Sequence, residues 1–208
     1  MHRTYLVLVR HGKSKWNKKG QWTGWKDIAL APEGIEEAKN TASQLQDFAL
    51  NTAFTSELIR AKQTLEVIKK DLKITIPTLS STALNERHYG IYTGKNKWDI
   101  ESKIGEEKFK TLRRAWDYPI KNGESLKDVY ARVVPYYDKT IAPVIRNGKN
   151  TIIVAHGNSL RALIKYLENI SDNDIEKLEI GTAEAWVYTL HGGNVTYKEI
   201  RSKNTQKV

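Results

Sequence analysis

The sequence predicts an α/β fold in which helices cover both faces of a mostly parallel central sheet. Residues 5–9 and 151–155 are short apolar runs with the length and β-branched content of buried strands. Segments with apolar residues at helical spacing alternate with such strands along the chain. Alternation of strands and helices is typical of parallel sheets whose crossover helices lie on both faces.

The first half of the chain contributes two predicted helices and one further strand. One helix begins at Pro32, a residue suited to a first helical position, although Ala31 before it has no side-chain acceptor for a cap. A short strand at 53–55 leads into the second helix, for which Ser56 is a candidate N-cap. The apolar positions of the first helix are Ile35, Ala38, Ala42, Leu45 and Phe48.

The second half contributes two more helices and a hairpin. Ser125 and Asp128 have the spacing of a capping box, and the helix that follows is expected to kink at Pro135. Apolar residues at helical spacing predict another helix over 160–170. Two runs at 185–190 and 195–197, separated by a turn that contains two glycines, predict a hairpin.

Composition indicates one globular domain over residues 1–208. The chain is 39% hydrophobic and 28% charged, and no apolar run approaches the ~20 residues of a membrane helix. The first apolar run is too short for a secretory signal, so a cytoplasmic location is expected. The chain has no cysteine, which excludes disulfides and thiolate metal sites.

The net charge of +10 suits an anionic partner but does not identify one. Nucleic acid, an anionic membrane surface and small polyanionic substrates all remain consistent with it. The basic residues are scattered along the chain, and no known nucleic-acid-binding module is apparent. We therefore expect a small anionic substrate, with no nucleic acid and no membrane as partner.

Both predicted strands end in a histidine followed by a glycine. The first leads into Arg10-His11-Gly12 and the second into His156-Gly157-Asn158. Ligands of open α/β sheets bind at the carboxyl ends of the strands. Two imidazoles at that edge, next to an arginine, indicate phosphoryl chemistry on histidine. The alternative is that each histidine simply packs in the core.

The neighbours of His11 favour a nucleophile. Like charge from arginines such as Arg10 lowers the pKa of an imidazole, which keeps a lone pair available near neutral pH. Gly12 permits close approach of a substrate or of backbone. Asn17 lies at a predicted helix start, where N–H groups bind anions. His156, as a neutral donor or a cation, would stabilise the charge of the transferred group.

Residues 86–90 contain a candidate proton donor and acceptor. Transfer between an imidazole and an alcohol needs a group that takes and returns the hydroxyl proton, and Glu86 is the candidate. The alternative is a surface pair of Glu86 with Arg87. Four other basic residues could add positive charge to the site, or they could be solvated surface residues: Arg60, Lys97, Arg113 and Arg114.

Other site classes lack their sequence patterns. The chain has no Gly-rich loop ending in Gly-Lys-Ser/Thr and no histidine or cysteine cluster with zinc spacing. Ser14 and Ser159 lack the strand–turn–helix setting of an activated serine. We therefore expect a site without a metal.

Three segments resemble the cofactor-dependent phosphoglycerate mutases of the histidine phosphatase superfamily. The first is Arg10-His11-Gly12-x-Ser14-x-Trp16-Asn17 with Trp22-Thr23-Gly24-Trp25-x-Asp27 after it. The second is residues 84–90, Leu-Asn-Glu-Arg-His-Tyr-Gly, and the third is residues 155–163. Arg-His-Gly alone is common to the superfamily, whereas the Thr-Gly-Trp and Asn-Glu-Arg-His-Tyr segments favour its mutase branch.

The resemblance implies that the chain has a phosphoglycerate mutase-like fold. It also implies that the protein is an isomerase of glycolysis and gluconeogenesis. His11 would be phosphorylated, with 2,3-bisphosphoglycerate as primer and intermediate, and 3- and 2-phosphoglycerate would be the anionic substrates. It assigns phosphoryl binding to Arg10, Asn17, Arg60 and His156, proton transfer to Glu86, and substrate contacts to Thr23, Gly24, Arg87, Tyr89, Lys97, Arg113, Arg114, Gly157 and Asn158.

Two alternatives stay open at this point. A histidine phosphatase that hydrolyses another small phosphoester would share His11, His156, Arg10, Arg60 and a carboxyl acid with a mutase. The two enzymes differ in the phosphoryl acceptor, which is a sugar acid in one and water in the other. The sequence also leaves open whether the chain forms a homo-oligomer.

Overall fold

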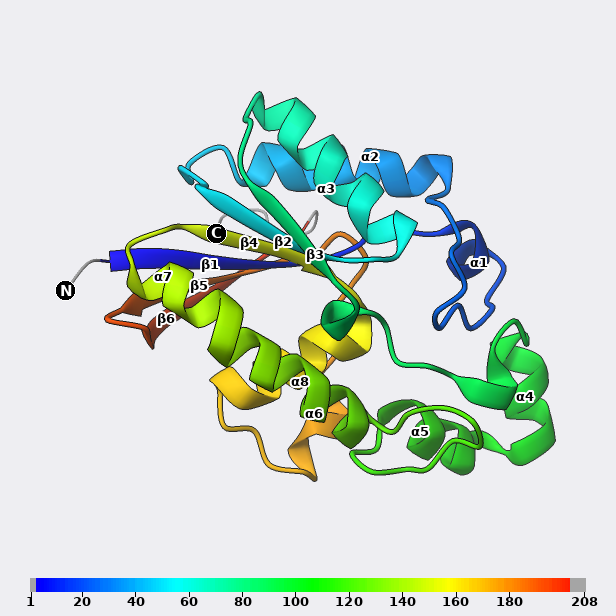
Figure 1. Ribbon diagram of the computed structural model, residues 1–208. Coiled ribbons are helices and arrows are strands. Elements are labelled where there is room, and N and C mark those ends of the chain that lie inside the picture. Colours follow the sequence, from blue (N-terminus) through cyan, green and yellow to red (C-terminus); the bar gives the residue numbers. More distant parts are fainter. Residues whose placement is uncertain (1–2, 203–208) are drawn as a thin grey trace, which may run out of the picture.

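A computed structural model describes residues 3–202, whose strands form one six-stranded sheet in the order β3-β2-β4-β1-β5-β6 (Figure 1). β1 (Arg3–Arg10), β2 (Thr52–Ser56), β3 (Thr78–Ser81) and β4 (Thr151–Ala155) are parallel. β5 (Ala185–His191) and β6 (Asn194–Arg201) pair antiparallel with their neighbours. The mostly parallel sheet is confirmed, and the two histidine-bearing strands are adjacent within it.

Helices cover both faces of this sheet, as predicted. α2 (Pro32–Gln44) and α3 (Ile59–Leu72) lie on one face, and α6 (Leu126–Tyr136), α7 (Ala142–Arg146) and α8 (Gly157–Leu167) lie on the other (Figure 1). Successive strand side chains point to opposite faces. Val7 and Val9 of β1 accordingly pack in the core under α2 and α3, whereas Leu6 and Leu8 pack in the core under α6 and α8.

A third group of helices lies beyond the carboxyl ends of the parallel strands. It consists of α1 (Lys15–Lys18), α4 (Lys97–Ile104) and α5 (Glu106–Arg114), which Figure 1 shows at one end of the sheet. Trp22 packs there with Ile100, Phe109, Leu112 and Ile120 in a small apolar cluster of its own. This group of helices covers the sheet edge at which ligands of α/β proteins bind.

Several local predictions are confirmed. Pro32 is the first residue of α2, and Ala31 before it makes no side-chain cap. Ser125 and Asp128 form the reciprocal hydrogen bonds of a capping box at the start of α6. The β5–β6 hairpin turns at two glycines with φ values of 61° and 91°, which a residue with a Cβ rarely adopts.

Other elements differ from the prediction. Ile35 is exposed on α2, although its spacing placed it on the apolar face. α6 runs through Pro135 to Tyr136, and a π-helical turn, η3 (Tyr137–Ile141), follows it directly. The edge strand β3 and helices α4 and α5 were not predicted.

The described part of the chain also contains three short 3-10 turns: η1 (Thr82–Leu84), η2 (Gly90–Tyr92) and η4 (Asp174–Lys177). None of the helices within residues 3–202 is long and apolar enough to cross a membrane.

Candidate active site

The two predicted histidines meet at the carboxyl edge of the sheet. β1 and β4 pair with Arg10 opposite Ala155, so the next residue of each strand is His11 and His156. The His11 N–H donates to the Ala155 carbonyl over 2.9 Å, which extends the pairing by one residue. The two rings are buried, with centroids 4.9 Å apart and planes inclined by 59°. Register between parallel strands thus brings together residues 145 positions apart in the sequence.

His11 has the protonation state that a nucleophile needs. Its Nδ1 lies 2.7 Å from the Gly12 carbonyl oxygen, which can only accept, so Nδ1 carries the proton and Nε2 keeps its lone pair. Burial, and then the charges of Arg60 and Arg10, hold the pKa of His11 well below its usual value. A neutral imidazole with a free Nε2 can attack phosphorus.

Close backbone packing fixes the turn that carries His11. A Cβ on Gly12 would lie 2.2 Å from the carbonyl oxygen of Gly34, so no other residue fits there without moving α2. The Gly12 N–H donates to Thr64 Oγ1 over 3.0 Å. The predicted close approach at this glycine is therefore made by backbone of the same chain.

Ser56 orients His156. Its Oγ lies 2.7 Å from Nε2 of His156 and also accepts the Leu58 N–H over 3.2 Å. Among the described residues, Nε2 is the one acceptor within hydrogen-bond distance of the serine proton, so the imidazole proton is assigned to Nδ1, a buried atom with no partner among those residues. Burial, followed by the charge of Arg60, lowers the pKa of His156 well below its usual value. The second imidazole is thus a neutral donor.

The prediction that Ser56 caps a helix is wrong. Ser56 is the last residue of β2, and the N-cap of α3 is Leu58, which makes no side-chain cap. Sequence position alone could not distinguish a serine that caps the next helix from one that turns toward the histidine at the end of the neighbouring strand, β4.

Two arginines surround the histidines with unused donors. Arg60 donates Nη1 to the Lys26 carbonyl over 3.0 Å and Nη2 to the Gly24 carbonyl over 2.8 Å. Arg10 donates Nη1 to the Ile180 carbonyl over 2.6 Å. The Nε of each arginine is buried with no partner among the described residues. Burial lowers the pKa of Arg60 to about 10, so it is still cationic at neutral pH.

Glu86 is held by one oxygen and free at the other. Oε1 accepts the Arg87 N–H over 2.7 Å and the backbone and side-chain N–H groups of Asn158 over 3.1 and 3.0 Å. Oε2 has no partner among the described residues and borders the cavity beside Gly157. Glu86 and Arg87 are 8% and 0% exposed, so the alternative of a surface pair is excluded.

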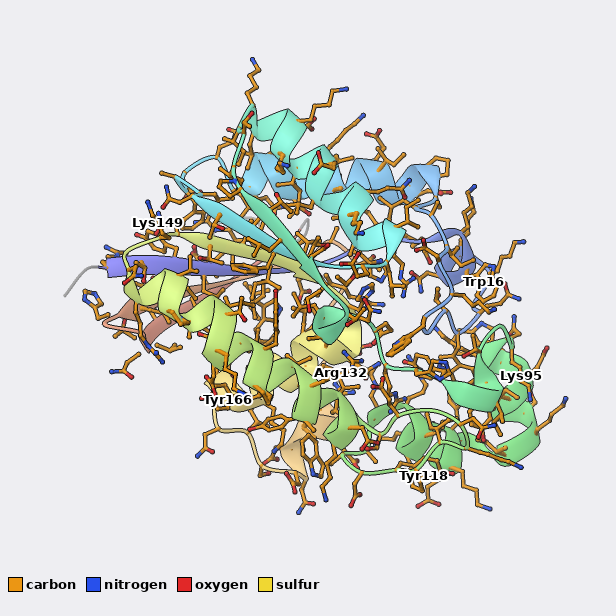
Figure 2. All side chains as sticks on the ribbon, viewed as in Figure 1. Trp16, Lys95, Tyr118, Arg132, Lys149 and Tyr166 are labelled. Carbon is orange, nitrogen blue, oxygen red and sulfur yellow. The ribbon has the colours of Figure 1, made fainter. Side chains whose placement is uncertain are left out.

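Arg132 supports the segment that carries Glu86. Figure 2 shows it reaching from α6 into the centre of the molecule. Its guanidinium donates to the carbonyls of Ala83, Asn85 and Glu86 over 2.8, 2.9 and 3.0 Å, and it is paired with Glu124. Sequence reasoning missed this residue, since an arginine on a predicted helix carries no sign of its distant carbonyl partners.

These groups line two adjoining recesses. Both are bordered by Arg10, Trp22, Glu86, Tyr89 and Lys97. The inner recess adds His11, Asn17, Gln21, Thr23, Gly24 and Arg60, and the outer recess adds Arg113, Arg114, Gly157, Asn158, Arg161, Glu179 and Ile180. Sequence reasoning assigned no role to Gln21, Trp22, Arg161, Glu179 or Ile180.

Two predicted site residues lie outside the lining of the recesses. His156 sits directly behind His11, as described above. Arg87 is fully buried, donates Nη2 to the Leu112 carbonyl over 2.8 Å, and packs 4.7 Å from the ring centre of Tyr89. Its Nε and Nη1 are buried with no partner among the described residues, so its contact with substrate stays a prediction.

The arrangement can bind a phosphoester and exchange its phosphoryl group. A neutral Nε2, cationic donors and a carboxylate with one free oxygen are the nucleophile, the charge stabilisers and the proton carrier of such a transfer. Within residues 3–202, no group of three or more histidine, cysteine or acidic side chains is arranged to hold a metal ion.

Comparisons with known proteins agree with this chemistry. The family model of the histidine phosphatase superfamily (branch 1) matches residues 6–203. A 2,3-bisphosphoglycerate-dependent phosphoglycerate mutase of Bradyrhizobium sp. is 47% identical over 193 residues, which cover 91% of this chain and 93% of that protein. The enzyme of that name from Methanosarcina acetivorans is 40% identical, with 92% and 94% covered.

Solved structures show the same fold. The crystal structure of a phosphoglycerate mutase from Bacillus anthracis aligns with a TM-score of 0.75 at 25% identity, covering 97% of this chain and 92% of that one. Sequence, fold and site geometry therefore agree that the chain belongs to the histidine phosphatase superfamily, within its family of 2,3-bisphosphoglycerate-dependent phosphoglycerate mutases.

Proposed function

We propose that this enzyme interconverts 3-phosphoglycerate and 2-phosphoglycerate through phosphorylated His11, in glycolysis and gluconeogenesis. The observation that carries the proposal is a neutral imidazole whose free Nε2 borders a recess lined with cations. The names of relatives at 40–47% identity support this reaction over hydrolysis of another small phosphoester.

Unpaired donors in the recesses support 2,3-bisphosphoglycerate as the primer. Its two phosphates and carboxylate need several donors, and the buried Nε atoms of Arg10 and Arg60 and Nδ1 of His156 have no protein partner among the described residues. Arg113, Arg114 and Lys97 add positive charge in the outer recess. When bound, the primer supplies the phosphoryl group that loads His11.

His11 and Glu86 carry the bond changes. In the loaded enzyme Nε2 holds the phosphoryl group, and the free hydroxyl of a phosphoglycerate attacks phosphorus, so the N–P bond breaks and an O–P bond forms. Oε2 of Glu86 takes the hydroxyl proton. In the second half, Nε2 attacks the other phosphate of the same molecule, and Glu86 returns the proton to the departing oxygen.

The surrounding groups stabilise and orient the reacting group. Arg10, Arg60 and Nδ1 of His156 are fixed donors around the transferred oxygens, and their positions are set before the reaction begins. Thr23, whose buried Oγ1 has no partner among the described residues, binds the substrate carboxylate together with Gly24. Asn17 uses its Oδ1 for Ser14, which leaves its amide N–H groups for the phosphoryl oxygens.

Labelling tests the proposal directly. Brief exposure to 2,3-bisphosphoglycerate carrying labelled phosphate should leave an acid-labile label on His11, and conversion of 3- to 2-phosphoglycerate should require that primer. The assay should run equally well in a chelator, since no step uses a metal. Conversion that ignores the primer, with rapid release of inorganic phosphate, would favour a phosphatase instead.

Lys97 should set the alkaline limit of activity. Burial, and then the charges of Arg113 and Arg10, lower the pKa of Lys97 to about 8. Its positive charge, which attracts the substrate, is present below that pH and is lost as the pH rises through it. We expect kcat/KM for 3-phosphoglycerate to fall above about pH 8.

The matched variant is Lys97→Arg, because a guanidinium keeps its charge throughout the assay range. This variant should retain kcat/KM to higher pH than the wild type. An identical alkaline limb in the two enzymes would show that another group causes the decline.

Ser56→Ala should slow transfer while preserving the fold. The variant leaves Nε2 of His156 buried without its 2.7 Å partner and frees the choice of tautomer. An unsatisfied buried group costs about 1–3 kcal/mol. If that cost falls on the orientation of His156 during transfer, kcat should drop by about 5- to 150-fold. Ser43→Ala, at an exposed serine of α2, is the control.

The pH profile separates orientation from stability. A misoriented His156 should change the acid limb of kcat, whereas a merely less stable enzyme keeps its profile and loses only active molecules. An unchanged kcat in Ser56→Ala would show that His156 needs no partner at Nε2.

A further inference from the structure

The outer recess contains one carboxylate that the proposed mechanism does not use. Among the described residues that line the two recesses, only Glu86 and Glu179 are acidic. Glu179 forms an ion pair with Nη2 of Arg114. A negative side chain is unexpected in a cavity whose ligands are anions, because it repels them and occupies a donor that they need.

The backbone around this ion pair is firmly held. Arg161 donates Nη2 to the carbonyls of both Arg114 and Ile175 over 2.8 and 2.7 Å, which ties the end of α5 to η4. Arg10 donates to the carbonyl of Ile180, the residue after Glu179. Glu179 is therefore fixed at the rim of the outer recess by its own neighbours in the chain.

The side-chain contact itself is weakly held. The Glu179 side chain is 68% exposed, whereas that of Arg114 is 19% exposed. An exposed ion pair shifts an equilibrium by no more than about fivefold, since water screens it and two long side chains lose freedom. A ligand anion with several oxygens can replace Glu179 on Arg114 without disturbing the backbone contacts.

We infer that Glu179 is a specificity-determining residue that competes with the second anionic group of the substrate for Arg114. The inference rests on the proposed function for the class of ligand, a phosphoglycerate or bisphosphoglycerate that spans both recesses. The expected effect is selective. Glu179 weakens the binding of ligands that reach the outer recess and does not change the binding of a lone phosphate beside His11. It also speeds release of small polyanions from a strongly cationic cavity.

Glu179→Gln tests this, because glutamine keeps the length of the side chain and removes its charge. We expect calorimetry to show 2,3-bisphosphoglycerate binding about fivefold more tightly to this variant than to the wild type at equal salt. Inorganic phosphate, which fills only the inner recess, should bind with unchanged affinity. Glu176→Gln is the control, since Glu176 lies on η4 outside both recesses and its removal changes the net charge equally.

A variant of the partner completes the test. In an Arg114→Gln background, Glu179→Gln should no longer tighten 2,3-bisphosphoglycerate binding beyond the effect of Glu176→Gln, because the contested donor is gone. If Glu176→Gln in the wild-type background tightened 2,3-bisphosphoglycerate binding as much as Glu179→Gln does, overall charge would explain the effect and the inference would be overturned. Weaker binding by Glu179→Gln would also overturn it, since Glu179 would then be positioning Arg114 for the ligand.

These measurements are independent of turnover. If the wild type binds 2,3-bisphosphoglycerate but fails to interconvert phosphoglycerates, the proposed function is wrong while the role of Glu179 is still decided by the binding data. If the wild type does not bind this ligand at all, both proposals fail before any variant is compared.

Discussion

Replacing His11 by alanine should lower phosphoglycerate interconversion by about 10⁴-fold or more, with the fold retained. The covalent acceptor of the phosphoryl group is lost, and no neighbouring nitrogen can replace it. In His156, Nε2 is bound to Ser56 and Nδ1 carries the proton, so that ring offers no lone pair to phosphorus.

The measurement combines turnover with labelling. His11→Ala should acquire no acid-labile label from 2,3-bisphosphoglycerate, yet should still bind the ligand through Arg10 and Arg60. His191→Ala, at an exposed histidine at the end of β5, should label and turn over normally. Near-normal turnover in His11→Ala would remove His11 from the chemistry, and loss of its cooperative thermal transition would attribute the defect to folding.

The catalytic centre is predictable from sequence because it depends on where strands end. His11 and His156 each follow a buried strand, and the carboxyl ends of parallel strands lie at one edge of the sheet. Arg60 follows the same logic, since it is the second residue of the helix that leaves β2. For such residues the local sequence pattern predicts their position at the end of a strand or the start of a helix, and the fold then determines which residues lie next to them.

The supporting groups escape prediction because their partners are distant and chosen by packing. Ser56 and His156 are 100 residues apart, and Arg132 reaches carbonyls 46 to 49 residues away. Arg87 lies within a matched segment, yet its guanidinium packs on the ring of Tyr89 and does not line either recess. A motif locates a stretch of backbone at the site but does not say which of its side chains enter the cavity.

The helices that cover the site, α4 and α5, were also not predicted from the sequence. α4 and α5 are short, and their apolar residues pack with Trp22 rather than with the main sheet. The two segments are short and contain few apolar residues, and their packing partner lies some 80 residues earlier in the chain. These helices nevertheless supply Lys97, Arg113 and Arg114, three of the cations that line the outer recess.

Glu86→Gln should slow phosphoryl transfer by about 10²–10⁴-fold while phosphoglycerate stays bound. A glutamine carbonyl can accept the three N–H bonds that now reach Oε1, so Asn158 and the turn at Arg87 keep their places. Its amide cannot take a proton from the attacking hydroxyl. Removing one negative charge from a cationic cavity does not weaken the binding of an anion. The Kd for 3-phosphoglycerate should therefore stay the same or fall.

Single-turnover quenching separates the two roles that Glu86 could have. Phosphorylated enzyme mixed with excess 3-phosphoglycerate reports the transfer rate alone, and calorimetry reports the Kd. Glu176→Gln, the same substitution outside both recesses, should change neither quantity appreciably. Parallel losses of binding and transfer in Glu86→Gln would assign Glu86 to holding Asn158 in place. The hydroxyl proton would then have to leave through another group, and among the described residues of the inner recess no second carboxylate is present to accept it.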